Sequence, residues 1–245
     1  MRILAIPARG WADELRQDIV GKSVLERQLD MATAWQFNEV VVSIRPEDTV
    51  PGGLAEIIGD RALVISELGP QDDDGIALSM ADCLTPLQHL PGLTQLTFLM
   101  PHILFRPQPP HQMFATQQAQ RSIHGTATTV YTRQVADRWR VNAIQGQLID
   151  KYACDDKASP GIVLAGTFTQ TLATWRSILR DANHRPGFEF LNRFEPIGGV
   201  HEHGLVAMQV PGAAWHDVAT EKGLASAREA FAERLSCSPI PEEVK

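Results

Sequence analysis

The chain has few cysteines, and they are scattered. Only three occur in 245 residues, at Cys83, Cys154 and Cys237, and no two form a Cys-x-x-Cys pair. Disulfide frameworks use even numbers of closely spaced cysteines, and zinc ribbons use paired Cys-x-x-Cys motifs. The sequence supports neither and favours a reducing compartment, so we expect a cytoplasmic protein.

Long apolar runs are also absent. A membrane-spanning helix needs about 18 or more consecutive apolar residues, and no stretch of this chain approaches that length. The N-terminus lacks a basic segment followed by a long apolar core, which is the mark of an exported protein. We therefore expect no membrane span and no export.

Positive charge is scarce as well. The 22 Lys and Arg residues are outnumbered by 29 Asp and Glu, which gives a net charge of −7. A protein that binds nucleic acid irrespective of base sequence needs a basic surface to attract phosphates. The composition argues against a nucleic-acid partner, although a local basic pocket is still allowed.

The chain does contain enough apolar material for a large core. Hydrophobic residues make up 44% of the sequence, which at this length fits one α/β domain. We assign this domain to residues 1–235. Residues 236–245, which include Pro239 and Pro241, are expected to form a flexible tail.

The first 44 residues predict a β-loop-α-β unit. Short runs of Ile, Leu and Val at 2–6 and 39–44 do not alternate with polar residues, which is typical of strands buried on both faces of a parallel sheet. Such a unit closes right-handed and places loop 7–15 at the carboxyl edge of the sheet, where open α/β sheets bind ligands. Between the strands, an apolar helical face is formed by Val24, Leu25, Gln28, Leu29, Met31, Ala32 and Trp35.

The same alternation continues along the chain and predicts an α/β fold: a single doubly wound, mostly parallel sheet of the Rossmann type, with helices on both faces. Strands are expected near residues 2–7, 39–44, 62–67, 95–100 and 162–168. Helices are expected over 54–58, 76–87, 112–121, 171–179 and 221–235, and a hairpin over 139–143 and 147–151. We expect the loops 7–16, 69–76 and 100–104 to share one edge.

Two charged clusters leave alternatives open. The run Asp72-Asp73-Asp74 precedes a helical pattern, so it is either a solvated cap that suits the helix dipole or part of a site. The triplet His201-Glu202-His203 contains metal-ligating residue types, but alternate strand positions without a third ligand favour a solvated hairpin end.

Both ends of the chain resemble the nucleotidylyltransferases, of which it looks like a divergent member. Ile6-Pro7-Ala8-Arg9 and Gly21-Lys22-Ser23-Val24-Leu25-Glu26 resemble that family's opening loop and Gly-Lys turn. Trp215-His216-Asp217-Val218-Ala219-Thr220 resembles its closing Trp-x-Asp signature, in which the Thr starts the last helix. The family includes sugar-1-phosphate, CMP-sugar-acid and phosphocholine-type enzymes, so the resemblance implies their fold over nearly the whole chain.

The resemblance also implies site residues. In the family the first loop cradles the triphosphate, a later glycine turn approaches the base, and two aspartates bind the catalytic Mg²⁺. The nucleotide-binding positions are then Pro7, Ala8, Arg9, Gly10, Gly75 and Ala77, and the catalytic positions are Arg16, Lys22 and Asp217. Acceptor-binding positions are Lys151, Ala165 and Gly166, and the metal positions, for Mg²⁺ or in its place Mn²⁺, are His102 and Asp217.

Three departures fall on charges that nucleotidyl transfer requires. Glu14 stands where the family has Arg, the segment Arg16-Gln17-Asp18 is short and lacks the signature Lys, and His102 replaces an Asp. Imidazole is a poor substitute for carboxylate on magnesium, which takes oxygen ligands. Arg9, Arg16 or Lys22 could supply the positive charge, but we expect any turnover to be weak or to use a softer metal.

Three functional hypotheses remain open. The first is transfer of a nucleotidyl group from an NTP to a phosphorylated sugar or small alcohol, with release of pyrophosphate. The second is a non-catalytic relative that binds a nucleotide or sugar nucleotide. The third is a nucleotide-sugar-dependent glycosyltransferase, which would carry an Asp-x-Asp motif where this chain has Pro101-His102-Ile103. The residues specify neither the nucleobase nor the acceptor, and a homo-oligomer is left open.

Overall fold

The computed structural model describes residues 1–49, 52–60, 62–65, 76–105, 126–134, 140–144, 147–152, 160–180, 205–209 and 215–236. Within 62–65, 126–165, 205–209 and 234–236 it describes the backbone alone. Gly75, the expected helix 112–121, the two charged clusters and the tail after Ser236 lie outside the described residues.

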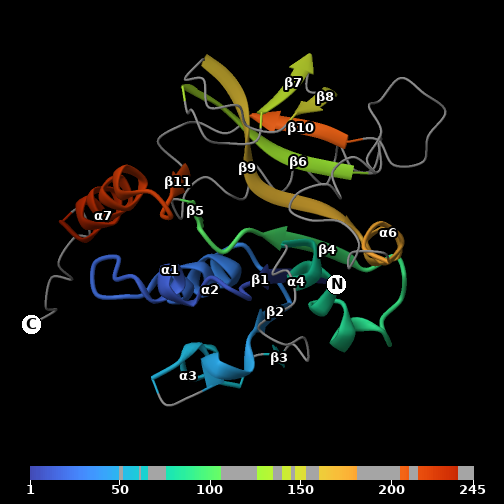
Figure 1. The fold of residues 1–245 in the computed structure, drawn as a ribbon, viewed down its shortest axis with the longest axis horizontal. Coiled ribbons are helices and arrows are strands. Elements are labelled where there is room, and N and C mark those ends of the chain that lie inside the picture. Colours follow the sequence, from blue (N-terminus) through green and yellow to red (C-terminus); the bar gives the residue numbers. More distant parts are fainter. Residues whose placement is uncertain are drawn as a thin grey trace, which may run out of the picture.

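A mixed sheet runs through the whole described part of the chain (Figure 1). Its nine described strands follow the order β3-β2-β1-β4-β9-β6-β10-β8-β7. They are β1 (Arg2–Pro7), β2 (Glu39–Ile44), β3 (Ala62–Ile65), β4 (Gln95–Leu99), β6 (Thr126–Gln134), β7 (Arg140–Ile144), β8 (Gln147–Tyr152), β9 (Pro160–Thr171) and β10 (Leu205–Gln209). A separate antiparallel ribbon pairs β5 (Ile103–Phe105) with β11 (Trp215–Asp217).

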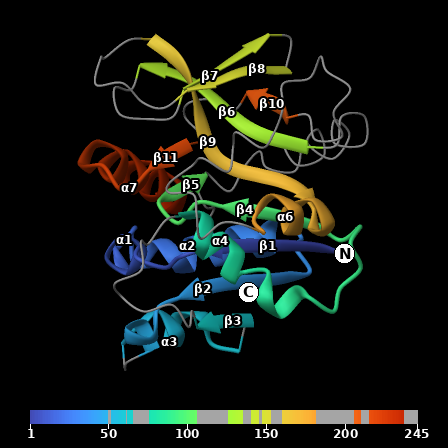
Figure 2. The same ribbon diagram turned by 45° about the vertical axis from the view of Figure 1, so that its right-hand side comes forward.

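The two halves of the sheet differ in strand direction. The strands β3, β2, β1 and β4 are parallel throughout, as the unbroken apolar runs predict for the first half of the chain. Strand β9 then pairs antiparallel with both β4 and β6. Figure 2 shows this long strand passing from the first half of the sheet to the second. The chain is therefore a mixed α/β protein whose parallel core is its first half.

Helices connect and cover these strands. The α-helices are α1 (Ala12–Arg16), α2 (Val24–Ala34), α3 (Leu54–Ile58), α4 (Ile76–Asp82), α6 (Leu172–Ile178) and α7 (Glu221–Ser236), with short 3₁₀ turns at Pro46–Thr49 and Thr85–Leu87. Helix α2 begins with a capping box, in which Ser23 Oγ accepts from Glu26 N at 3.2 Å and the Glu26 carboxylate accepts from Ser23 N at 2.6 Å. These bonds to Ser23 lower the pKa of Glu26.

Most expected elements are confirmed, with one correction. The strands at 2–7 and 39–44 and the helix at 54–58 have the expected bounds, and β7 and β8 form the expected hairpin. The single helix expected over 76–87 is wrong: α4 ends at Asp82, and a 3₁₀ turn follows at Thr85–Leu87. Pro86 explains the break, because its ring would clash with the carbonyl of Asp82 if the helix continued.

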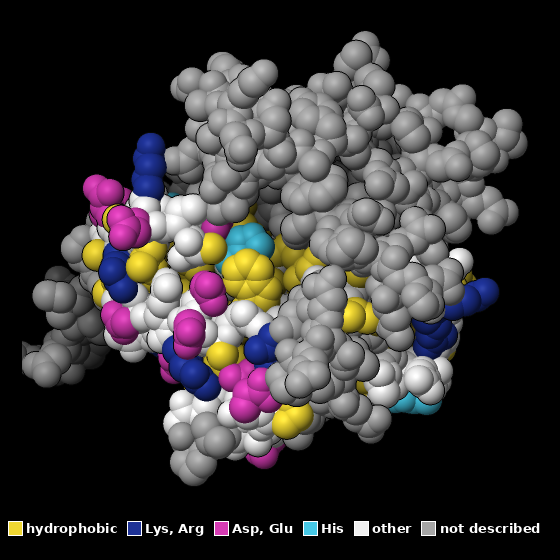
Figure 3. Space-filling view, viewed as in Figure 1, with side chains coloured by type: hydrophobic (Ala, Val, Ile, Leu, Met, Phe, Trp, Pro, Cys, Tyr) yellow, Lys and Arg dark blue, Asp and Glu magenta, His cyan; other side chains and the backbone are white. Residues whose placement is uncertain are grey.

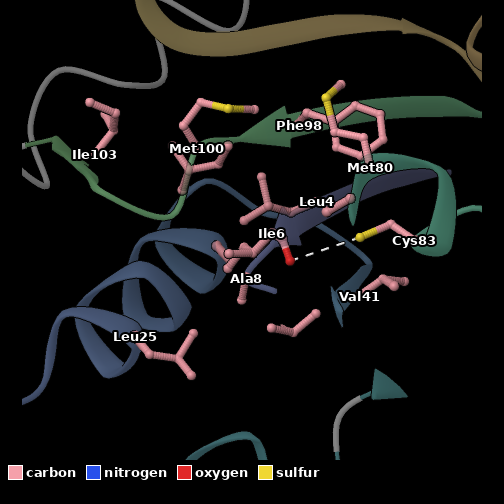
Figure 4. Close-up of a cluster of buried hydrophobic side chains, with 14 of the residues drawn as sticks. Leu4, Ile6, Ala8, Leu25, Val41, Met80, Cys83, Phe98, Met100 and Ile103 are labelled. Carbon is pink, nitrogen blue, oxygen red and sulfur yellow. Dashed lines mark hydrogen bonds between the residues drawn. The ribbon is translucent and has the colours of Figure 1, made fainter. Parts of the chain in front are cut away.

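The core surrounds β1. Ile3, Leu4 and Ile6 are completely buried, and each such side chain stabilises the fold by roughly 1.5–3 kcal/mol. Figure 4 shows Leu25 of α2, Met80 of α4, Cys83 just after α4 and Phe98 of β4 around the same strand. The Cys83 thiol lies 3.8 Å from the Ile6 carbonyl oxygen, and burial raises its pKa to about 12. None of the described helices is both long enough and apolar enough to cross a membrane.

Candidate functional site

The loop that leaves β1 is anchored by two buried serines. Ala8 N donates to the Ser43 carbonyl at 2.9 Å, and Arg9 N donates to Ser79 Oγ at 3.3 Å. The two hydroxyls lie 2.7 Å apart, so the end of β2, helix α4 and the loop form one hydrogen-bonded unit. Sequence analysis missed both serines, although each is a polar residue inside an apolar run at this edge of the sheet.

The nucleotide-binding residues predicted in this loop differ in exposure. Pro7, Ala8 and Arg9 are buried, with the Arg9 side chain only 1% exposed, whereas Gly10 is exposed at the tip. Ala77, the predicted partner from α4, is completely buried in the core. A ligand at this edge would therefore meet the backbone of the loop more readily than the side chain of Ala77.

Two predicted phosphate-neutralising residues already have acidic neighbours. An Arg16 guanidinium nitrogen lies 3.5 Å from Asp48 Oδ1, and Lys22 Nζ lies 2.7 Å from Asp30 Oδ2. The pKa of Asp48 is raised, chiefly by burial, and the hydrogen bond from Arg45 N and the charge of Arg16 oppose this shift. The Lys22 pair is about half exposed, and exposed pairs contribute about 0–1 kcal/mol, so a phosphate could replace Asp30 at little cost.

The turn after β4 brings His102 to the first loop. Pro101 and His102 are the middle residues of a tight turn closed by Ile103 N donating to the Met100 carbonyl at 3.1 Å. The His102 ring stacks on Trp11, with ring centroids 4.6 Å apart and planes inclined by 26°. In Figure 3 a histidine lies against a hydrophobic ring near the middle of this face. The loops 7–16 and 100–104 therefore meet at one edge, as their sequence positions predict.

Asp217, the last residue of β11, lies beside the turn that carries His102. In the β5–β11 ribbon it pairs with Ile103, and Val218 N donates to the His102 carbonyl at 2.9 Å. Asp217 is 5% exposed, and its Oδ1 accepts from Ala219 N at 3.1 Å. The short ribbon was not anticipated, because three-residue strands carry too little pattern to detect. It brings together two residues that are 115 positions apart in the sequence.

The first turn of α7 fixes the backbone of Asp217. Thr220 Oγ1 accepts from Gly223 N at 3.1 Å, which confirms the expected helix cap, and donates to the Asp217 carbonyl at 3.0 Å. A Cβ on Gly223 would lie 1.8 Å from the Asp217 carbonyl oxygen, far inside contact distance. Only a glycine fits this arrangement, so Gly223 supports the backbone of Asp217.

Asp217 and His102 would offer a metal ion one hard ligand and one softer ligand. The Asp217 carboxylate is an oxygen donor of the kind that Mg²⁺ and Mn²⁺ prefer, whereas imidazole suits later transition metals. Among the described residues, no three His, Cys, Asp or Glu side chains gather into a metal-binding group. Mg²⁺ commonly uses one or two carboxylates together with substrate phosphates, so Asp217 could hold it without a full protein cage.

The predicted acceptor-binding residues lie on the second half of the sheet. Lys151 lies in β8 and Ala165 in β9, where only the backbone is described. Gly166 is buried against the His102 turn, and its carbonyl accepts from Met100 N at 2.8 Å. It has φ 76°, and a Cβ there would lie 2.8 Å from Ile103 Cγ1. Gly166 thus supports the turn from the side of β9.

Helix α7 also contacts the Gly-Lys turn. Arg27 of α2 donates to the carbonyls of Ile19 and Val20 at 2.7–3.0 Å, and its guanidinium carbon lies 5.0 Å from the centre of the Phe231 ring. Val20 has φ 53°, a strained conformation for a β-branched residue that these bonds hold in place. Arg228 Nε donates to the Asp18 carbonyl at 3.0 Å. The helix after Asp217 therefore holds the turn that carries Lys22.

Solved structures with the same fold complete this description. HddC from Yersinia pseudotuberculosis aligns over 94% of this chain and 99% of its own, with a TM-score of 0.69 and 12% sequence identity. HddC complexed with GMP-PN gives the same coverage and TM-score at 13% identity. A Bacillus anthracis protein assigned as a glucose-1-phosphate thymidylyltransferase, in complex with sucrose, has 12% identity, a TM-score of 0.69 and 94% coverage of both chains.

At these identities the likeness concerns the fold. No protein-family model matches the chain, and no curated protein matches it by sequence.

Proposed function

We propose that this chain binds an NTP or sugar nucleotide at the edge shared by loop 7–16 and turn 100–103, and transfers the nucleotidyl group to a phosphorylated sugar or small alcohol. The observation that carries the proposal is the junction of Trp11, His102 and Asp217 at the carboxyl edge of the parallel strands. Ligands of open α/β sheets bind at this edge. Fold neighbours described as a thymidylyltransferase and as a complex with GMP-PN support the same general chemistry.

The proposal includes the finer architecture. In the order β3-β2-β1-β4, strands β2 and β3 lie on one side of β1, and β4 lies on the other side. Right-handed connections would therefore place α2 and α3 on one face of the sheet and α4 on the other face. Contacts between Ser43 and Ser79, on α4, and between α2 and α3 agree with this doubly wound arrangement. We also retain the assignment of residues 1–235 to one domain.

Some of the site residues would position the substrates, and others would neutralise their charge. The backbone of loop 7–10 would cradle the phosphates, with Arg9 enclosed behind it and Lys22 able to exchange Asp30 for a phosphate oxygen. Asp217 would hold a divalent cation, which would neutralise charge on the reacting phosphates. An acceptor phosphate oxygen then attacks the α-phosphorus, and pyrophosphate leaves. Lys151, Ala165 and Gly166 stay as the proposed acceptor side.

A second candidate function is nucleotide binding without catalysis. Glu14 brings negative charge to the phosphate loop, and His102 stands where a second carboxylate would serve the metal. Phosphoryl transfer depends mainly on positioning and charge neutralisation, so these two changes weaken the chemistry more than the binding. We therefore expect slow turnover, or turnover that prefers a metal softer than Mg²⁺.

The deciding experiment combines thermal shift with pyrophosphate release. Four NTPs and several sugar nucleotides are tested with Mg²⁺ or Mn²⁺, using wild type, Asp217→Asn and the matched surface control Asp30→Ala. We expect a metal-dependent rise in Tm for wild type and Asp30→Ala, and none for Asp217→Asn. An equal rise in all three proteins would contradict the assignment of Asp217.

The kinetic arm separates the two functions. Pyrophosphate is measured with sugar phosphates and phosphocholine as acceptors. Turnover in the common enzyme range of about 1–1000 s⁻¹ with Mg²⁺ would show that Glu14 and His102 are compensated. Binding without turnover would select the non-catalytic function, and hydrolysis or transfer from a sugar nucleotide alone would select the glycosyltransferase hypothesis.

A further inference from the structure

Gln28 is a buried polar residue on the otherwise apolar face of α2. Its side chain is completely enclosed, and its Nε2 lies 3.2, 3.0 and 2.9 Å from the carbonyl oxygens of Met100, Pro101 and Ile103. All three partners are acceptors, so the amide nitrogen must face them, and its two hydrogens are shared among three oxygens. One side chain therefore holds three of the four residues of the turn that presents His102.

The fourth carbonyl of this turn is also bound. His102 O accepts from Val218 N at 2.9 Å, which joins the turn to the strand that ends in Asp217. Met100 N donates to the carbonyl of Gly166, in β9, at 2.8 Å. With its backbone held by α2, β9 and the residue after Asp217, the turn has one position relative to Asp217. Gln28 donates three hydrogen bonds to this turn, more than either of the other two segments contributes.

The other end of the Gln28 amide carries a cost to stability. Gln28 Oε1 is buried and has no hydrogen-bond partner among the described residues. A buried acceptor without a donor costs stability. A polar group kept at such a cost is typical of a place where geometry matters more than stability.

We propose that Gln28 is a positioning residue that sets where His102 stands relative to Trp11 and Asp217. The expected effect on nucleotide binding rests on the proposed function, whereas the expected effect on the position of His102 does not. In Gln28→Met the three carbonyls lose their donor, and the turn is free to shift. His102 then leaves its stacked position, and nucleotide loses a site of defined shape.

Arg176 provides a matched control. One of its guanidinium nitrogens also lies within 2.7–3.3 Å of three carbonyls, those of Leu87, Gln88 and Leu90. These residues lie at the end of the 3₁₀ turn Thr85–Leu87 and just after it, and not in the turn that bears His102. Arg176→Met thus removes the same kind of interaction elsewhere. Any effect that Gln28→Met shows and Arg176→Met lacks comes from the His102 turn.

The direct readout is the NMR shift of the His102 Hε1 proton, assigned by its loss in His102→Asn. We expect stacking on the Trp11 indole to move this proton upfield in wild type, because protons above an aromatic ring are shielded. We expect Gln28→Met to abolish the upfield shift and to weaken metal-dependent nucleotide binding about tenfold, a common size for such supporting residues. Arg176→Met should change neither.

The two proposals can fail separately. If wild type binds no nucleotide, the proposed function fails, and the Hε1 shift alone decides the role of Gln28. An unchanged shift in Gln28→Met overturns the positioning role, whatever the binding result. If Gln28→Met does not fold, Gln28→Asn replaces it, since its shorter amide cannot reach all three carbonyls; an unchanged shift there overturns the role equally.

Discussion

The two sides of the candidate site are held in different ways. Around Asp217 and His102 the backbone is fixed, because every carbonyl of turn 100–103 is bonded and Gly223 packs directly against Asp217. In loop 7–22 the backbone is also anchored, but Arg16 and Lys22 engage acidic partners in ion pairs that are partly exposed for Arg16 and about half exposed for Lys22. The positions of residues are therefore fixed on the side of His102 and Asp217, whereas loop 7–22 offers charged side chains that can exchange their partners.

The most severe way to break the fixed side is Gly223→Ala. The added methyl would meet the Asp217 carbonyl at 1.8 Å, and neither backbone can move without disrupting the start of α7. We expect the free energy of unfolding to fall by about 3 kcal/mol, the upper end of overpacking penalties, with loss of metal-dependent nucleotide binding. Urea denaturation measures the change. Lys222→Ala, at the exposed neighbouring position, is the control, and equal stability of the two variants would contradict this packing.

Gly166→Ala tests the support beneath the His102 turn. Its φ of 76° disfavours a side chain, and the new Cβ would crowd Ile103 at 2.8 Å and Met100 at 3.0 Å. We expect a loss of about 2 kcal/mol from strain and crowding together. Gly52→Ala separates the two causes, because Gly52 has φ 75° and nothing within 4 Å of its Cβ position. A loss no greater than that of Gly52→Ala would show that the contact with Ile103 is unimportant.

Asp48 gives a pH test of the adjustable side. Its pKa is raised, chiefly by burial. A carboxyl whose pKa is higher in the folded protein stabilises the fold below its unfolded pKa of about 3.9, and this contribution is lost as pH rises through the folded pKa. The stability of wild type relative to Asp48→Asn should therefore fall between pH 3 and pH 7.

Urea denaturation at pH 3, 5 and 7 measures this difference for Asp48→Asn. Asp30→Asn is the control, since its carboxylate is about half exposed in the pair with Lys22. A difference between wild type and Asp48→Asn that stays constant or rises with pH would contradict the dominance of burial at Asp48.

The smallest effect on stability is expected for Lys22→Met. Its ion pair with Asp30 is about half exposed, so the free energy of unfolding should change by less than about 0.5 kcal/mol. Nucleotide affinity should nevertheless fall about tenfold, and most strongly at low salt, because a charge-assisted bond to phosphate is lost. Isothermal titration at two salt concentrations tests this. Asp30→Ala should bind at least as tightly as wild type; weaker binding there would mean that Lys22 serves Asp30 and not a phosphate.

Much of the parallel half could be predicted from local patterns. Several features depend only on residues that are close together in the sequence: the apolar runs at 2–7 and 39–44, the Ser23–Glu26 capping box and the Thr220 cap. Such features can be recognised from the sequence alone. The antiparallel pairing of β9 with β4 depends on residues about 70 positions apart and left no comparable local sign. Pro86 was also visible in the sequence, but the apolar spacing around it led us to predict one continuous helix.

The amino-acid sequence by itself determined the type of the first strands. It also predicted that a ligand binds at loop 7–16 and, through the family resemblance, that His102 and Asp217 act as a pair. Tertiary structure alone decided that the two meet through a three-residue ribbon, and that Gln28, Gly166 and Gly223 fix their positions. The physical reason is that a pattern reports which surface a residue buries, whereas close packing and a shared carbonyl depend on which distant segment arrives there. A glutamine on an apolar helix face carries no mark of the turn that it will hold.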